Sequence, residues 1–478
     1  MQAFDEHSFP SKRVFLVSAG MDKPKKRDNP FARQHYYLNY GLLGLATNLK
    51  SAGFDPIVVH GLFHNPENVI DRLKSLGLDN GDTPVLLSLP SFYSVPWASR
   101  FCKKVVEDFP HQKFVVGGRW VVNGRAEWIA SRIPNVSLVV YGTAENKIPN
   151  IVTKCLNRAM PGVGIEDLRN DSNAPPDQVE YSLLDEALLF NPSIEVSRGC
   201  GRGCVFCEEK DVKRQPLKSP LSVVRQAGAL VDFYKTASIT PYFEASLFMA
   251  NHHWINELIR LRSESKMDFL WRCETRVDTI TQETLELLAK SGLKVVDLGL
   301  ESASKSQLLR MSKTPRPDDY LRKADVILRQ AKECGIWMKV NVLLFPGETQ
   351  QTLNKTVQWI GDRKDCIKGV SVGSTIVYGL RHEVTHLLEY YESLGAYPSV
   401  EEHEQIEGVT RLNISRKIDL HTAEQLSIEV SKQFMNARDY YDLKAFSYFS
   451  RAYQYEDFLK DLSQANSDML PFRVSGDD

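Results

Sequence analysis

Three cysteines in one short segment are the residues best suited to chemistry. Cys200, Cys204 and Cys207 lie in SRGCGRGCVFCEEK, directly after the strand-like run SIEVSR. Three thiolates on one tight loop can bind three irons of a four-iron, four-sulfur cluster. The glycines beside them allow the backbone to wrap closely and to direct N–H groups at the cluster sulfurs. The fourth iron would have no protein ligand from this loop, which leaves it open to a substrate or a cofactor.

Two other interpretations of the triplet remain as alternatives. A structural zinc site needs a fourth ligand, and zinc knuckles usually pair cysteines across two-residue gaps. Here the gaps are three and then two residues, and no second cysteine group is present. The other cysteines are scattered singly, at Cys102, Cys155, Cys273, Cys334 and Cys366. Three unbound buried thiols are the second alternative. The single group also argues against auxiliary iron–sulfur centres.

Composition describes a globular chain in a reducing compartment. The 478 residues include 59 Lys+Arg and 60 Asp+Glu, and 42% are hydrophobic. This length predicts two to four domains, and the near-zero net charge excludes a basic nucleic-acid carrier and an acidic disordered chain. Eight cysteines are too few for a disulfide scaffold. The sequence shows neither a secretory signal nor a stretch long enough to span a membrane, so we expect a cytoplasmic protein.

Strand-like runs alternate with amphipathic helical segments over the first third of the chain. The runs are RVFLVS (13–18), PIVVH (56–60), PVLLSL (84–89), KFVVGG (113–118) and SLVVYG (137–142). Five β/α units in this order predict a Rossmann-like, doubly wound α/β domain over residues 1–158. Gly117 and Gly118 follow a strand end, where such folds usually bind ligands.

The alternation of strand-like and helical segments stops at residues 159–190, which we interpret as a linker because prolines, Asp and Asn accumulate there. The alternation resumes with six strand-like runs, at 193–198, 237–246, 268–273, 294–302, 337–345 and 369–379. Six units predict a partial (β/α)6 TIM barrel over 191–380, with chemistry at the carboxyl ends of its strands. Residues 381–478 read as a mostly helical domain, and we expect its aromatic stripe to form core.

The cysteine loop and its context resemble the radical SAM superfamily. The spacing CxxxCxxC, with Phe206 before the last cysteine, lies after the first strand of a partial barrel as it does in that family. The segments WRCETRVD, KVVDLGLES and GIWMKVNVLLFPGET resemble the core of the branch that carries an N-terminal cobalamin (B12)-binding-type domain. The first domain of this chain resembles the cobalamin-binding-type domain of that branch, so the resemblance covers roughly residues 12–380.

The resemblance implies a set of cofactors and ligands. In this family the open iron binds S-adenosylmethionine (SAM), and one electron cleaves it to methionine and a 5′-deoxyadenosyl radical. The family's cluster ligands correspond to Cys200, Cys204 and Cys207. Phe206 corresponds to a residue near the adenine, or else it is an apolar plug beside the cluster. An external electron donor such as flavodoxin or ferredoxin would supply the electron.

Four further residues are candidates on the barrel strands. Glu244 lies where the family often has a Gly-Gly-Glu segment near the methionyl amine, although both glycines are missing here. Glu301 could bind the ribose hydroxyls or form a salt bridge, for example with Arg276. Arg276 could pair instead with the SAM carboxylate. Cys273 would lie at or beside the barrel mouth, either as a catalytic hydrogen-atom donor or as a buried inert thiol.

Cobalamin binding is the open question for the first domain. The Asp-x-His-x-x-Gly loop that supplies an axial imidazole in one binding mode is missing, since His35 lacks both flanking residues. Ser88, Gly117 and Gly118 keep other parts of the family's pattern. The alternatives are a cobalamin site without a protein histidine and a relict domain that only supports the barrel.

The leading hypothesis is a radical SAM enzyme that performs cobalamin-dependent methylation of an unactivated carbon. The alternative is a cobalamin-independent radical oxidation, rearrangement or cyclisation, and a third hypothesis is a non-enzymatic iron–sulfur scaffold protein. No peptide-recognition module or basic nucleic-acid patch is evident, so a small-molecule substrate is the default expectation.

Overall fold

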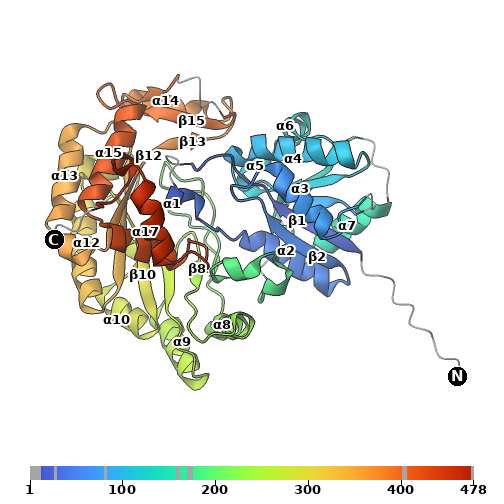
Figure 1. Ribbon diagram of the computed structural model, residues 1–478. Helices are drawn as coiled ribbons and strands as arrows, with labels where there is room; N and C mark the ends of the chain where they lie inside the picture. The colour runs from blue at the N-terminus through green and yellow to red at the C-terminus, as the bar shows by residue number, and fades with distance from the viewer. Residues whose placement is uncertain are drawn as a thin grey trace. The chain divides into compact units, whose positions relative to one another are not determined.

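The protein consists of two compact units. The computed structural model describes residues 12–25, 30–79, 83–157, 162–169, 176–400 and 406–474. The first unit comprises Met1–Lys25 and Tyr37–Ala187, and the second comprises Lys26–Tyr36 and Leu188–Asp478. Each unit contains a six-stranded sheet, and Figure 1 labels the elements of both. No helix in these described ranges has the length and apolar content required to cross a bilayer.

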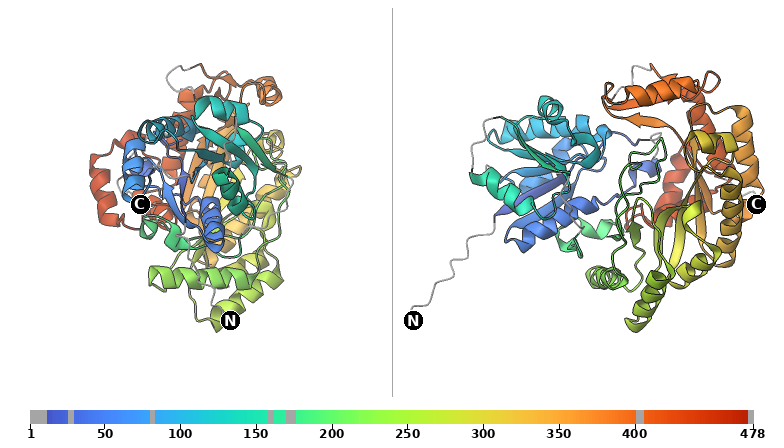
Figure 2. Two further views of the ribbon diagram at one scale, coloured as in Figure 1. Left: turned by 90° about the vertical axis from the view of Figure 1, so that its right-hand side faces the viewer. Right: turned by 180° about the vertical axis from the view of Figure 1, so that it is seen from behind.

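The first unit is a doubly wound parallel sheet, as predicted. Its strands pair in the order β2-β1-β3-β4-β5-β6, and every pairing is parallel. Helices α2 and α7 contact each other, as do α3 and α4, and the two pairs cover opposite faces of the sheet (Figures 1 and 2). The strands are β1 Arg13–Ser18, β2 Asp55–His60, β3 Val85–Ser88, β4 Phe114–Gly117, β5 Val136–Gly142 and β6 Gly164–Leu168; the helices are α2 Tyr40–Ser51, α3 Pro66–Ser75, α4 Val95–Asp108, α5 Arg119–Val122, α6 Ala126–Arg132 and α7 Ile148–Asn157.

Strand β6 corrects one interpretation. It falls inside residues 159–190, which we assigned to a linker, and it pairs in parallel with β5 from Leu138↔Gly164 to Gly142↔Leu168. Its first four residues alternate between half-buried and exposed, and only Leu168 is buried, so no continuous apolar run marks this edge strand in the sequence.

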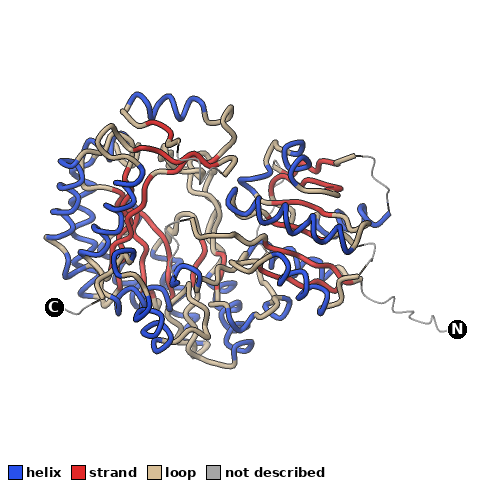
Figure 3. Tube along the Cα trace, turned by 45° about the horizontal axis from the view of Figure 1, so that its top comes forward, coloured by secondary structure: helices blue, strands red, loops and turns tan. Residues whose placement is uncertain are grey.

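The second unit contains the predicted partial barrel. Six parallel strands pair in the order β12-β11-β10-β9-β8-β7, the order of a (β/α)6 half-barrel. Helices line one side of this sheet (Figure 3). The strands are β7 Ser193–Glu195, β8 Tyr242–Glu244, β9 Trp271–Arg276, β10 Leu293–Glu301, β11 Trp337–Leu344 and β12 Gly369–Ser374; the helices are α8 Pro220–Tyr234, α9 His252–Glu264, α10 Gln282–Lys290, α11 Lys305–Arg310, α12 Pro317–Glu333 and α13 Gln350–Gly361.

The two faces of the barrel sheet differ in chemistry, because side chains alternate along each strand. On the face toward the helices, Trp271 stacks on Phe243 with ring centroids 4.4 Å apart, and both are buried. On the opposite, inner face, Arg272 pairs with Asp297, which also binds Lys339 at 2.8 Å. The inner face is therefore the polar one, where the candidate ligands lie.

The C-terminal region is helical, as predicted, but it also contains strands. A small antiparallel sheet pairs in the order β13-β15-β14. The predicted aromatic core is confirmed: Phe31, from α1, packs in one buried cluster with Tyr440, Phe449 and Phe458 of the C-terminal region. The elements are α1 Pro30–Arg33, β13 Ile376–Tyr378, α14 Thr385–Ser393, β14 Tyr397–Pro398, β15 Val409–Asn413, α15 Leu420–Gln433, α16 Ala437–Ala445 and α17 Tyr455–Gln464.

Candidate functional site

The cysteine loop follows β7, at the carboxyl end of the first barrel strand. Its backbone folds back on itself, because Cys200 N–H donates to Val212 O at 2.9 Å and Gly203 N–H donates to Lys210 O at 3.3 Å. A tight turn links the last two cysteines, where Cys207 N–H donates to Cys204 O at 3.0 Å. These bonds hold the three cysteines on one compact loop.

Glycine geometry is required at the entry to this loop. Gly199, Gly201 and Gly203 have φ of 76°, 65° and 70°, in the left-handed region that other residues rarely adopt. A Cβ at Gly199 would lie 2.4 Å from Lys213 O, so the backbone of Lys213, which runs back past Gly199, leaves no room for a side chain. The sequence expectation of a closely wrapped glycine loop is confirmed by these angles.

The three thiols are free and differ in exposure. Cys204 is buried, whereas Cys200 and Cys207 are half-buried. Burial raises the pKa of Cys200, and it raises that of Cys207 to about 11. Such thiols stay protonated at neutral pH unless a bound metal displaces the proton. The backbone N–H of Glu209 lies 3.4 Å from the Cys207 sulfur and donates to it, as N–H groups do around iron–sulfur clusters.

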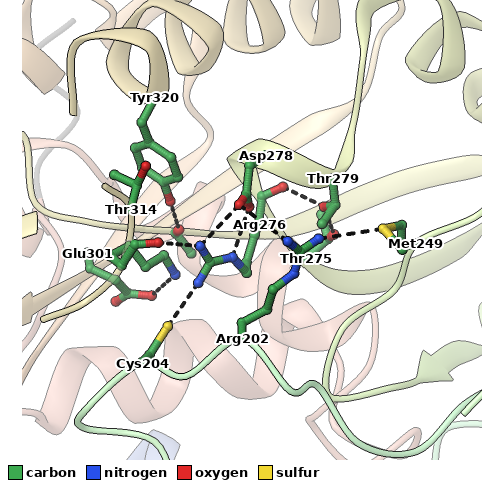
Figure 4. A network of polar contacts seen from close by, with 12 residues as sticks. Arg202, Cys204, Met249, Thr275, Arg276, Asp278, Thr279, Glu301, Thr314 and Tyr320 are labelled. Carbon is green, nitrogen blue, oxygen red and sulfur yellow. Dashed lines mark hydrogen bonds and ion pairs between the residues drawn. The ribbon is translucent and has the colours of Figure 1, made fainter. Parts of the chain in front are cut away.

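A guanidinium group donates a hydrogen bond to the sulfur of Cys204. Arg276, at the end of β9, donates from Nη1 to Cys204 Sγ over 2.9 Å (Figure 4). Asp278 holds the same guanidinium through two hydrogen bonds, of 2.9 and 3.2 Å, and Lys313 O accepts a further one. The predicted pairing of Arg276 with Glu301 is therefore wrong, because Asp278 lies two residues away on the same turn and satisfies the charge.

Glu301 pairs with a different cation. Its Oε1 accepts from Lys313 Nζ at 2.9 Å, and both side chains are largely buried. Glu301 has φ of 67°, and a register shift in β10 occurs between Gly299 and Glu301. A Cβ at Gly299 would lie within 3.0 Å of both ion-pair partners, so the glycine gives the pair its space. Glu301 thus ends its strand beside Arg276, as Figure 4 shows.

Glu244 ends β8 and has one polar side-chain partner, the hydroxyl of Ser193 at 2.9 Å. Burial raises its pKa to about 7. The adjacent strand places Glu274 beside it, and the Glu274 side chain is exposed to solvent. Phe206 is half-buried and packs edge-on against Phe345, with ring centroids 6.4 Å apart.

Cys273 does not join this group. It lies between Arg272 and Glu274 on β9, so alternation directs its side chain to the helix-covered face, away from Arg276. It is fully buried, and burial raises its pKa. The structure thus gives Cys273 the environment of an inert core thiol.

The candidate cobalamin residues lie at the carboxyl edge of the first sheet. Ser88 Oγ accepts from the Asn39 amide at 3.1 Å. Gly118 has φ of 132°, and a Cβ there would lie 2.4 Å from Leu89 O, whereas a Cβ at Gly117 would meet nothing within 4 Å. Gly118 therefore serves close packing, and Gly117 borders open space at the strand end.

Several residues of the site were not predicted from the sequence. Asp278, Lys313 and Arg202 surround Arg276, and Glu274 lies two residues before it on the same face of β9. The alternation of charged residues Arg272, Glu274 and Arg276 was a detectable signal for a polar inner face. The pairing with Lys313 had no local signal, because it joins residues far apart in sequence.

The donor set fits a four-iron, four-sulfur cluster. Three free thiols lie on one loop, and a backbone N–H and a guanidinium donate to two of the sulfurs. Within the described ranges, no three His, Cys, Asp or Glu side chains converge on a single metal ion. Cluster thiolates each bind a separate iron, so they need not converge.

Comparison with known proteins shows what the barrel is similar to. Residues 194–360 match the model of the radical SAM superfamily, so this part of the chain is similar to a radical SAM domain. Members of this family use a [4Fe-4S] cluster and SAM. The matched range contains all three cysteines and four of the six barrel strands, β8 to β11, in full.

Individual relatives refine this picture. An uncharacterized methyltransferase of Pyrococcus horikoshii is 23% identical over 299 residues, which are 58% of this chain and 64% of the relative, so less than two thirds of the relative is covered. The radical SAM methyltransferase TsrM of Kitasatospora setae, solved with tryptophan and a SAM analogue, superposes with a TM-score of 0.61 at 16% identity, covering 85% of this chain and 86% of TsrM.

A second solved structure has the same TM-score. The cobalamin-dependent SAM radical enzyme OxsB, solved with aqua-cobalamin, matches with a TM-score of 0.61 at 15% identity, covering 91% of this chain and 67% of OxsB. At these identities the likeness shows the fold alone, a doubly wound α/β domain and a half-barrel in one chain.

Proposed function

We propose that this protein is a cobalamin-dependent radical SAM methyltransferase acting on a small molecule. The observation that carries the proposal is the loop of three free thiols at the carboxyl end of β7, with Arg276 donating to one of the sulfurs. The fold shared with TsrM and OxsB, including the doubly wound domain, supports the cobalamin part.

When bound, the cluster supplies the electron that cleaves SAM to a 5′-deoxyadenosyl radical, and cobalamin supplies the methyl carrier. Cys200, Cys204 and Cys207 would each bind one iron. Glu244 would accept a hydrogen bond from the methionyl amine of SAM, because it is a carboxylate with only a neutral hydroxyl as its side-chain partner. Glu301, at the end of β10, would accept hydrogen bonds from the ribose hydroxyls of SAM.

The first unit would bind the corrinoid at the carboxyl edge of its sheet. Ser88 presents a hydroxyl there, and the open space at Gly117 allows a ligand to approach the backbone closely. Gly118 would support this edge through its close contact with Leu89 rather than contact the ligand. His35 belongs to the second unit and packs against Phe449, so it is not assigned as an axial ligand.

Methyl transfer from labelled SAM tests the proposal. Anaerobically reconstituted protein receives cobalamin, dithionite, SAM labelled in its methyl group, and a small-molecule extract. We expect labelled carbon-methylated product together with 5′-deoxyadenosine. Equal product formation by corrin-free protein, without label transfer, would instead support radical oxidation or rearrangement.

Two variants provide a matched pair for this experiment. Cys204→Ala removes one proposed iron ligand and should abolish both products and the iron content. Cys334→Ala removes a half-buried thiol outside the loop and should retain both products. Retained iron and activity in Cys204→Ala would contradict the assignment of the cluster ligands.

A further inference from the structure

Arg276 occupies an unusual position for a charged side chain. Its guanidinium is 7% exposed and lies on the inner face of the barrel, and it is the group that contacts the Cys204 sulfur. Cys204 is itself 6% exposed, so the contact is shielded from water. The guanidinium donates to the Cys204 sulfur over 2.9 Å. Once a bound iron displaces the thiol proton, this contact becomes a charge-assisted hydrogen bond, which is stronger than one between neutral groups.

We propose that Arg276 is a positioning residue for the iron–sulfur cluster, which donates a charge-assisted hydrogen bond to the Cys204 thiolate and thereby raises the cluster's reduction potential. The inference rests on the proposed cluster at this loop. It assigns to Arg276 a role other than binding the SAM carboxylate.

The physical reason is the charge that the cluster gains on reduction. One electron from an external donor adds one negative charge to the cluster and its thiolates, and no proton needs to move. A cation that donates to a ligand sulfur stabilises this reduced state more than the oxidised one, and hydrogen bonds to the sulfurs are among the main determinants of such potentials. Asp278 holds the guanidinium through two hydrogen bonds, and an arginine side chain keeps its positive charge in proteins.

The surrounding contacts fix the guanidinium in place. Asp278 binds Nε and Nη2, Lys313 O accepts from Nη2, and Nη1 is left for the sulfur. Arg202, from the cysteine loop itself, approaches Asp278 at 3.8 Å and so links the loop to the same carboxylate (Figure 4). A planar guanidinium can satisfy these partners at once, whereas a lysine ammonium is a compact point charge on a flexible stem.

Three variants separate the role of the hydrogen bond from that of charge. Arg276→Gln removes the cation and its hydrogen bond, and Arg276→Lys keeps a charge without the planar fork. Arg202→Gln is the matched control, because it removes a cation beside the same Asp278 that touches none of the three cysteine sulfurs in the described contacts. The measurement is an EPR-monitored redox titration of the reconstituted full-length protein with dithionite, in the absence of SAM.

We expect Arg276→Gln to make the cluster about tenfold harder to reduce, a downward shift of about 59 mV for a one-electron couple. Arg276→Lys should shift the potential by a smaller amount, and Arg202→Gln should shift it least. An unchanged potential in Arg276→Gln, or an equal shift in Arg202→Gln, would overturn the inference. If Arg276→Gln does not retain its cluster, Arg276→Lys decides: a lowered potential supports the role, and an unchanged one refutes it.

SAM binding provides a further discriminating readout. A marked loss of SAM affinity in Arg276→Gln, with an unchanged SAM-free potential, would assign Arg276 to the SAM carboxylate and refute the inference. Failure of the wild-type protein to assemble any iron–sulfur cluster would instead refute the proposed function, so the two failures are distinguishable.

Discussion

Gly199 and Gly203 share a left-handed backbone conformation but differ in their surroundings. A Cβ at Gly199 would lie 2.4 Å from a backbone oxygen, whereas one at Gly203 would meet nothing within 4 Å. Gly203→Ala should therefore cost only the conformational penalty, about 1 kcal/mol. Gly199→Ala adds a clash with rigid backbone and should cost about 3 kcal/mol or more and lower the iron content. Thermal unfolding and iron analysis of both variants would check this; equal effects would contradict the close approach at Lys213.

Cys273 allows a second test at the scale of one residue. Its side chain is fully buried on the helix-covered face of β9, so Cys273→Ala should lower the free energy of unfolding by about 1 kcal/mol through the small cavity it leaves. The iron content and the yield of 5′-deoxyadenosine per folded protein should stay at the wild-type level. Loss of that yield in a folded, cluster-containing variant would restore the catalytic role that the sequence suggested.

The sequence was most informative where spacing alone determines chemistry. Cys200, Cys204 and Cys207 could be identified because three ligands close together on one loop do not depend on distant parts of the chain. The partner of Glu301 could not be identified, because Lys313 reaches it only after helix α11, which lies between them, has folded. The SAM, ribose and cobalamin roles of Glu244, Glu301, Ser88, Gly117 and Gly118 remain predictions.

Strands β9, β10 and β11 are joined by a buried charge network on the inner face of the barrel. Arg272 is 0% exposed and Asp297 is 2% exposed, and Asp297 also accepts from Lys339. Asp297→Ala leaves buried cations without their counter-charge, so we expect a loss of about 3–5 kcal/mol. Asp365→Asn breaks the exposed pair with Lys332 and should leave the Tm unchanged. Equal Tm values for the two variants in a thermal melt would contradict the importance of burial.

The turn between β11 and α13 contains a carboxyl group that makes stability depend on pH. Glu348 is 2% exposed, and burial raises its pKa to about 7. Because the folded state holds this proton more tightly than the unfolded state, stability falls as pH rises from about 4.5 to about 7. Above that window the ionised carboxylate costs about 3–4 kcal/mol.

Glu348→Gln tests this dependence, because the amide keeps an acceptor for the Thr352 hydroxyl and carries no charge. The variant should melt at a higher temperature than the wild type at about pH 8.5 and at the same temperature at about pH 5. Comparison of the two proteins at each pH cancels the titration of all other groups. A stability difference that does not change with pH would contradict the raised pKa.

Elements with a strong periodic pattern were predicted well, and edge elements were not. The inner strands of the first sheet carry continuous apolar runs because helices cover both of its faces. The barrel strands β9 and β11 instead alternate apolar and polar side chains, because helices cover one face only, and both patterns are visible in the sequence. Strand β6 is half-exposed at a sheet edge, and strand β14 is only two residues long, so neither carries a periodic apolar pattern.

For the whole molecule, the order of β/α units was sufficient to predict two parallel sheets. It did not predict that Phe31, close to the N-terminus, belongs to the aromatic core of the C-terminal region. Contacts across such a sequence distance depend on the complete fold of the second unit. The match of residues 194–360 to the radical SAM superfamily agrees with the resemblance carried by the cysteine loop.

The most direct test of the account is the EPR spectrum of the dithionite-reduced protein, isolated without oxygen from iron-replete cells, before and after SAM is added. An iron that lacks a protein ligand must change its environment when SAM chelates it. We predict the signal of a reduced [4Fe-4S] cluster that SAM alters. A protein that contains zinc in place of iron, or a cluster signal that SAM leaves untouched, would contradict the account.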